Sequence, residues 1–202
     1  AEGRGHGRLA PQHAWTLRTD TEAGVKWVWD KFLPMGGLTL LAAFMKVGKS
    51  TLAYPLALAV ARGTDFLDHA TRQGAVLILA VEEHPRDVDN RLREFGLEET
   101  DPIYCHVGPC AHDDDNLRAL ESFIREHDIR LLLIDTITNF WDVTSENDNA
   151  EVRRAISPLL ALARDTGAAL MLVGHENKTG GADGRSIRGA GALFGLVDQA
   201  IM

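Results

Sequence analysis

The chain has 202 residues, of which 45% are hydrophobic and 25% charged, a composition typical of a globular domain and too apolar for a disordered one. Its formal net charge of −8 excludes a chain-wide basic surface for nucleic acid, although a local basic groove would suffice for a few phosphate contacts. No apolar run approaches the roughly 18 residues of a membrane span, and residues 1–7 lack the apolar segment of a secretory signal. We therefore expect a cytoplasmic protein without membrane contact.

The N-terminal residues differ in composition from the rest of the chain. Residues 1–24 carry glycine, arginine, histidine and proline without periodicity, which predicts a flexible lead-in to one domain over residues 25–202. The aromatic segment from Val25 to Phe32 predicts a short strand or turn packed on the core. A last apolar run begins at Val197 and stops at Met202, so we expect a domain that is cut at its C-terminal edge.

Apolar runs alternate with helical patterns along this domain. The runs predict buried strands over Leu38–Ala42, Ala75–Val81, Ile103–Val107, Leu131–Ile134 and Ala168–Val173. The helical patterns cover Lys49–Arg62, Pro85–Phe95, Asn116–His127 and Asn149–Thr166. Pro55 lies inside the first helix, where we expect a bend near Thr51 rather than a break. The alternation predicts an α/β fold with a mostly parallel sheet between layers of helices.

A phosphate-binding loop is predicted where the first strand meets the first helix. The pattern G-x-x-x-x-G-K-[ST] wraps phosphates in backbone N–H groups at a helix N-terminus, and here an alanine replaces its first glycine. Gly48 allows close backbone approach, Lys49 suits the β- and γ-phosphates, and the Ser50 hydroxyl suits Mg²⁺. The alternative is a glycine-containing turn with a surface lysine. The predicted nucleotide-binding residues are Ala43, Phe44, Met45, Lys46, Val47, Gly48, Lys49, Ser50 and Thr51.

Two later strands end in carboxylates, which in α/β sheets point into the ligand crevice. The strand before Glu82 and Glu83 makes Glu82 the candidate general base that orients the attacking water. Glu83 is expected to be a solvated carboxylate at a helix start, and the opposite assignment of the two neighbours stays open. Four apolar residues followed by Asp135 form a Walker B pattern, whose carboxylate holds the Mg²⁺ shell near Ser50.

A third predicted strand ends in a different polar group. His175 follows an apolar run, and a polar side chain at that position can contact the γ-phosphate and report its presence, although a lone histidine is more often structural. Three successive strands with polar ends favour the sensor role.

A cysteine–histidine cluster raises the alternative of a zinc site. It comprises Cys105, His106, Cys110 and His112. Structural zinc sites usually combine two separate knuckles, and the chain has no second cluster of this kind. We therefore expect neither zinc nor a disulfide here.

Taken together, four segments resemble the RecA-like P-loop ATPases, above all the hexameric replicative helicases of the RepA and DnaB type and the RadA repair ATPase. They are Leu38–Arg62, Val76–Leu92, Leu131–Thr136 and Leu170–Asp198. The resemblance implies binding of ATP or ADP with Mg²⁺ and assembly into a homo-oligomeric ring. By position it makes Lys49 and Ser50 the phosphate and magnesium residues, Glu82 the catalytic glutamate, Asp135 the Walker B aspartate and His175 the sensor.

The same resemblance implies a DNA-facing loop over Asn177–Arg188, which is rich in glycine, lysine and arginine. It offers Lys178, Arg185 and Arg188 to single-stranded DNA, and its glycines predict high mobility without a ligand. The arginine finger that the family supplies from a neighbouring subunit is not identifiable in this sequence.

Three functions compete at this point. The first is a nucleic-acid-dependent motor ATPase of the helicase or recombinase kind, and the second is a regulatory ATPase that switches partners. A small-molecule phosphotransferase is the third and the least favoured, because no arginine-rich lid follows the second strand.

Overall fold

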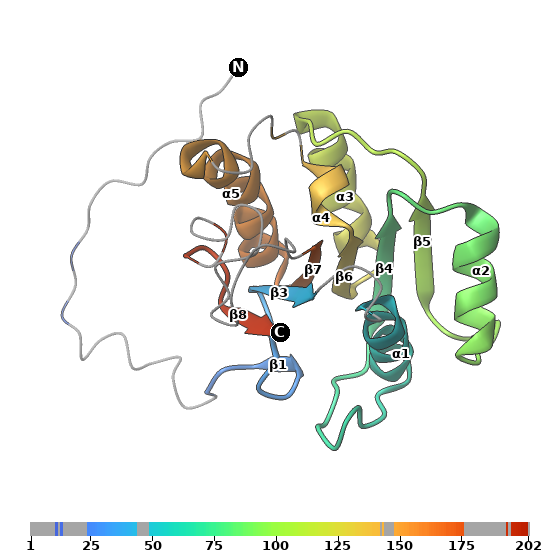
Figure 1. Cartoon of the computed structure of the whole chain (residues 1–202). Coiled ribbons are helices and arrows are strands. Elements are labelled where there is room, and N and C mark those ends of the chain that lie inside the picture. Colours follow the sequence, from blue (N-terminus) through green and yellow to red (C-terminus); the bar gives the residue numbers. More distant parts are fainter. Residues whose placement is uncertain are drawn as a thin grey trace.

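A computed structural model describes residues 24–43, 49–141, 143, 148–175, 193 and 195–201, together with residues 11 and 13. At residues 43, 49, 50 and 175 it describes the backbone only. Within these residues the chain folds as a central sheet between two layers of helices (Figure 1).

The central sheet has six strands in the order β5-β4-β6-β7-β3-β8, and every neighbouring pair is parallel. The strands are β3 (Leu38–Ala43), β4 (Ala75–Ala80), β5 (Ile103–Val107), β6 (Ile129–Asp135), β7 (Ala169–His175) and β8 (Gln199–Ile201). β3 lies between β7 and β8, and β7 separates β3 from β6. The predicted α/β fold is confirmed, as are its strands to within two residues at each end.

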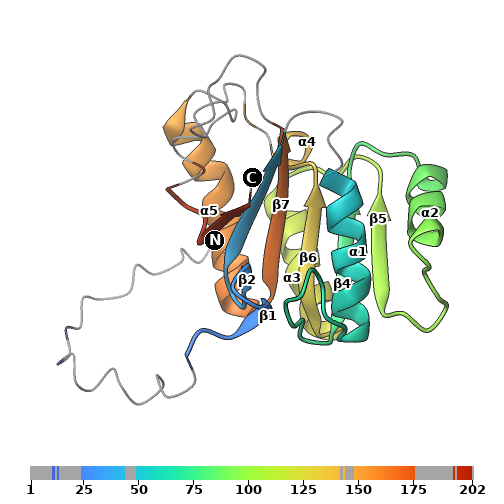
Figure 2. The ribbon, with the colours of Figure 1, turned by 60° about the horizontal axis from the view of Figure 1, so that its bottom comes forward.

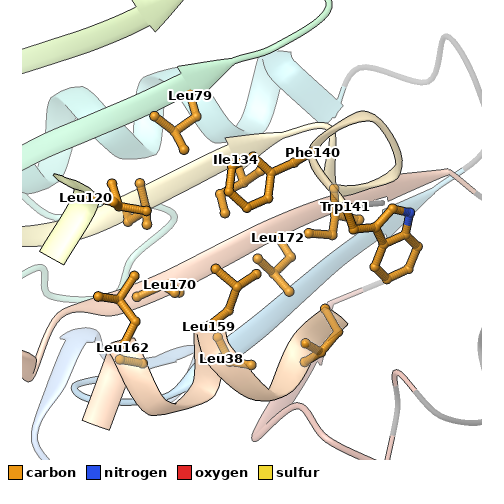
Figure 3. Packing of buried hydrophobic residues seen from close by; sticks show 14 of the residues in the cluster. Leu38, Leu79, Leu120, Ile134, Phe140, Trp141, Leu159, Leu162, Leu170 and Leu172 are labelled. Atoms are coloured by element: carbon orange, nitrogen blue, oxygen red, sulfur yellow. The ribbon is translucent and has the colours of Figure 1, made fainter. Parts of the chain in front are cut away.

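Helices cover both faces of this sheet (Figures 1 and 2). They are α1 (Lys49–Arg62), α2 (Pro85–Glu94), α3 (Asp114–Glu126), α4 (Ile137–Phe140) and α5 (Asn149–Thr166). Buried residues of α1 and α2 share one hydrophobic cluster with alternate residues of the strands, and those of α3, α4 and α5 share the other. Figure 3 shows the second cluster, in which Leu159 of α5 packs against Leu38 and Leu172 of the sheet. Because successive side chains of a strand point to opposite faces of the sheet, the strands contribute to two hydrophobic cores, one on each face.

The ends of the helices follow from local sequence. α1 runs from residue 49 to residue 62 as predicted and passes through Pro55 without a break, while the expected bend near Thr51 stays a prediction. α3 begins two residues before the predicted start, because Asp113 caps it by accepting a hydrogen bond from the Asn116 N–H at 2.8 Å. The four-residue helix α4 was not predicted, since so short a turn has no measurable periodicity.

The aromatic segment before β3 forms a separate hairpin. β1 (Trp27–Trp29) pairs antiparallel with β2 (Leu33–Pro34), which confirms the predicted short strand. The Trp29 ring stacks on Phe32 at 4.2 Å between centroids, and its indole N–H donates to the Phe66 carbonyl at 3.1 Å. The hairpin is thus fastened to the loop that follows α1.

Gly37 lies where the hairpin, β3 and β8 meet. We expect Gly37→Ala to lower the free energy of unfolding by about 1–3 kcal/mol. A Cβ at this position would lie 2.7 Å from Pro34 Cγ and 2.8 Å from Asp198 Oδ2. The same carboxylate oxygen accepts the Leu38 N–H at 2.9 Å, so the added methyl would push β8 away from β3. Urea unfolding measures the loss. If the clash with Asp198 is the cause, the cost falls in an Asp198→Ala background; an equal cost in both backgrounds would contradict this explanation.

Candidate active site

The register of the sheet brings the ends of four strands to one rim. Ala80 of β4 pairs with Asp135 of β6, Asp135 pairs with Val173 of β7, and His175 at the end of β7 pairs with Ala43 at the end of β3. Each predicted polar or phosphate-binding position lies at one of these strand ends or shortly after it. Segments that lie far apart in the sequence therefore meet at a single edge of the sheet.

Asp135 is the buried carboxylate of this rim. Its residue is only 5% exposed. The side chains of Leu131 and Leu133 belong to the cluster packed under α1, so period-2 alternation directs Asp135 to the same face. The Asp135 carbonyl accepts the N–H of Val81 at 3.1 Å, and the peptide bond from Asp135 to Thr136 is cis. A carboxylate thus lies on the face that α1 covers.

Glu82 stands beside Asp135 on the neighbouring strand end. Its side chain is exposed, and the buried Thr136 hydroxyl donates to its Oε1 at 3.3 Å. This hydrogen bond joins the end of β4 to the end of β6. Sequence reasoning missed Thr136, because a threonine after a Walker B aspartate carries no pattern of its own.

Glu83 has a different environment from Glu82. The Nη1 nitrogen of Arg91 on α2 donates to both of its carboxylate oxygens, at 2.6 and 2.7 Å. Arg91 also lies over the ring of Tyr54 on α1, 5.0 Å from the ring centroid. Glu83 is therefore a half-buried, ion-paired carboxylate rather than a solvated one, and this part of the prediction was wrong because the side chain of Arg91 in α2 contacts it.

Tyr54 is fully buried beneath Arg91. Its burial, and then the negative charges of Glu83 and Asp135, raise the pKa of the phenol well above its usual value. The ring is consequently neutral, and Arg91 rests on its π face rather than on a phenolate.

The predicted phosphate loop lies between β3 and α1. β3 ends at residue 43 and α1 begins at residue 49, so Lys49 and Ser50 open the helix, followed by the exposed Thr51. Phe44, Met45, Lys46, Val47 and Gly48 lie outside the described residues, as do Lys178, Arg185 and Arg188. His175 is the last residue of β7, next to the end of β3, and its side chain is not described. The roles of these residues stay predictions.

Three members of the cysteine–histidine cluster, Cys105, His106 and Cys110, line a pocket of about 430 Å³ between β4, β5 and α3. The surrounding protein desolvates the Cys105 thiol and raises its pKa to about 11, and desolvation followed by the charge of Asp113 raises the pKa of Cys110. Both thiols are free, and the described part of the chain holds no group of three or more metal-binding side chains.

These features together define a P-loop NTPase. A parallel sheet between helices carries acidic strand ends on the rim where the loop from β3 enters α1. The profile of the family described as "AAA domain" matches residues 8–181. The chain belongs to this family of RecA-like P-loop ATPases.

Two curated proteins share distant similarity with the chain. It is 29% identical over 169 residues to the DNA repair protein RadA of Halalkalibacterium halodurans and 27% identical over 183 residues to that of Synechocystis. In both comparisons 82% of the chain is aligned, but only 32% and 33% of the relative. The chain thus spans about a third of the length of these relatives.

Within the described residues, none of the helices combines the length and the apolar character that crossing a bilayer requires.

Proposed function

We propose that this domain binds ATP with Mg²⁺ at the rim formed by β3, β4, β6 and β7 and hydrolyses it. The observation that carries the proposal is the meeting of Glu82, Asp135 and Thr136 at the strand ends beside the helix that Lys49 and Ser50 open. Membership of a P-loop ATPase family supports nucleotide binding.

The described residues fit a magnesium ion better than a transition metal. Mg²⁺ is usually held by one or two protein oxygens together with substrate phosphates and water. The rim offers the buried carboxylate of Asp135 on the face of α1, whose second residue is Ser50. We infer that Asp135 and Ser50 hold the ion, which when bound would neutralise charge on the phosphates.

Glu82 is proposed to activate the attacking water. Its exposed carboxylate accepts a proton from water as the water oxygen bonds to the γ-phosphorus and the bond to the ADP oxygen breaks. Lys49 would stabilise the charge on the phosphate oxygens, and His175 would respond to the γ-phosphate. The negative charge of Glu83 is already paired with the positive charge of Arg91, which supports the assignment of the base to Glu82.

We further propose that the ATPase is a nucleic-acid-dependent motor or recombination ATPase that works as a ring. The similarity to proteins named for DNA repair supports this. The basic residues Lys178, Arg185 and Arg188 would contact single-stranded DNA. A regulatory ATPase without motor activity is the alternative, and the acidic net charge of −8 is compatible with it.

Steady-state ATP turnover with and without single-stranded DNA, at several protein concentrations, tests this proposal. A motor is expected to be stimulated by DNA, and turnover per subunit should rise on assembly by about 10³- to 10⁵-fold if a partner's arginine completes the site. DNA-independent turnover that does not change with concentration would instead support the regulatory alternative. Absence of Mg²⁺-dependent ATP turnover under all these conditions would overturn the proposed activity itself.

A further inference from the structure

A chain of three side chains connects the phosphate-loop helix to the strand end that carries Glu82. It starts at Tyr54 in α1, continues through Arg91 in α2 and ends at Glu83, directly after Glu82. Arg91 contacts both partners at once, because a flat guanidinium can stack on a ring while its edge donates hydrogen bonds. We call these three residues the Arg91 clamp.

The clamp is better shielded from solvent than an ordinary surface ion pair. The side chains of Arg91 and Glu83 are 29% and 20% exposed. On the same helix, Arg93 and Asp89 form an ion pair with side chains 71% and 52% exposed. Exposed pairs of the second kind contribute little to structure, whereas a shielded pair with a hydrogen-bonded carboxylate fixes its geometry.

The position of Glu83 bears directly on Glu82, because the two residues are adjacent in the bend between β4 and α2. Among the described residues, the side chain of Glu82 makes a single hydrogen bond, the 3.3 Å contact from Thr136. Such a bond alone leaves the carboxylate free to swing. A general base has to be held within about 0.5 Å of its productive position, and a displacement of about 1 Å can lower a rate by about 100-fold.

We propose that Arg91 is a positioning residue for Glu82: it ties Glu83 to Tyr54 of the phosphate-loop helix and thereby fixes the backbone from which the Glu82 carboxylate extends. The proposal rests on the proposed ATPase activity. Arg91 acts on the chemical step through Glu82 and is not required to contact nucleotide.

The test compares single-turnover ATP hydrolysis with nucleotide affinity in a set of variants of the whole chain. Arg91→Lys keeps the charge but cannot lie flat on Tyr54 while holding Glu83, so its rate constant should fall about 10- to 100-fold. The rate constant of Glu83→Gln should fall by about tenfold, because the amide loses the charge-assisted hydrogen bonds. The dissociation constant of a fluorescent ATP analogue should change by less than about twofold in both, since binding does not depend on Glu82.

Two further variants separate positioning from packing. Tyr54→Phe keeps the neutral ring under Arg91 and should retain the rate, whereas Tyr54→Leu removes the π face and should lose it. Arg93→Gln, which breaks the exposed pair on the same helix, is the matched control and should leave rate and affinity unchanged. All rates are measured at a temperature at which circular dichroism shows each variant folded. If Tyr54→Leu does not fold, Arg91→Lys and Glu83→Gln decide the question, because both lie at a half-buried surface.

The outcomes distinguish the two proposals. Loss of rate with retained affinity in Arg91→Lys, together with a wild-type rate in Tyr54→Phe and a lowered rate in Tyr54→Leu, supports the clamp. Wild-type rates in folded Arg91→Lys and Glu83→Gln, in a protein whose activity still disappears in Glu82→Gln, would overturn the clamp and leave the ATPase proposal standing. A wild-type protein without turnover, or one indifferent to Glu82→Gln, would overturn the ATPase proposal instead.

Discussion

Glu82→Gln is expected to retain ATP binding and lower the rate of hydrolysis by about 10² to 10⁴-fold, the usual contribution of a general base. The amide has the size of the carboxylate and still accepts the hydrogen bond from Thr136, but it cannot take a proton from water. Because the side chain is exposed, the fold should not change. Phosphate release in a single turnover measures the rate, and titration calorimetry with ATP and Mg²⁺ measures the affinity.

Glu83→Gln provides the matched comparison, because it makes the same chemical change one residue later. The Glu83 carboxylate is already ion-paired with Arg91, so the loss of rate in Glu83→Gln should be smaller than in Glu82→Gln, about tenfold. A larger effect at Glu83 than at Glu82 would show that the base has been assigned to the wrong neighbour.

Lys49→Ala is expected to weaken ATP binding by about 100-fold and to remove turnover. Charge-assisted hydrogen bonds contribute about 1.5–3 kcal/mol each, and a loss of about 2.8 kcal/mol corresponds to a factor of 100. Lys49 is the first residue of α1, where a cation reaches phosphates held at the helix N-terminus. Calorimetry with ATP and Mg²⁺ measures the affinity.

Lys26→Ala is the control for this substitution, since Lys26 is exposed and precedes the hairpin strand β1. It removes one positive charge without touching the rim and should leave the affinity unchanged. Thermal unfolding should give the same midpoint for wild type and Lys49→Ala. Equal ATP affinity in wild type and Lys49→Ala would contradict the assignment of the phosphate loop.

The sequence predicted the elements of this fold well because its strands are buried on both faces. Runs such as Leu131–Ile134 are continuous apolar segments, and the turns and caps between them carry strong signals, such as Pro85 at the start of α2. The order of the strands in the sheet was not predicted, since periodicity does not encode which strands become neighbours. The placement of β7 between β6 and β3 needed the structure.

The candidate site was predicted only in part, for a related reason. Glu82 and Asp135 were found because each ends a strand, and parallel strands end at one rim. Arg91 was missed as a partner of Glu83, because their contact crosses the bend between a strand and a helix and follows no helical spacing. Tyr54 was not singled out from the sequence, because its contact with Arg91 depends on how α2 packs.

The pairing of β3 with both β7 and β8 has a thermodynamic consequence for the sheet itself. The chain leaves the sheet at His175, in register with the end of β3, and returns at Gln199 on the other side, in register with Thr39, so these anchor points lie two strand spacings across the sheet and four residues along it, roughly 16 Å apart. Bringing the ends of a long segment together costs entropy, and here that cost is borne by folding of the sheet. The contacts of β3 with β7 and β8 therefore have to offset this closure entropy, and the stability of β3 within the sheet depends on both of its neighbours.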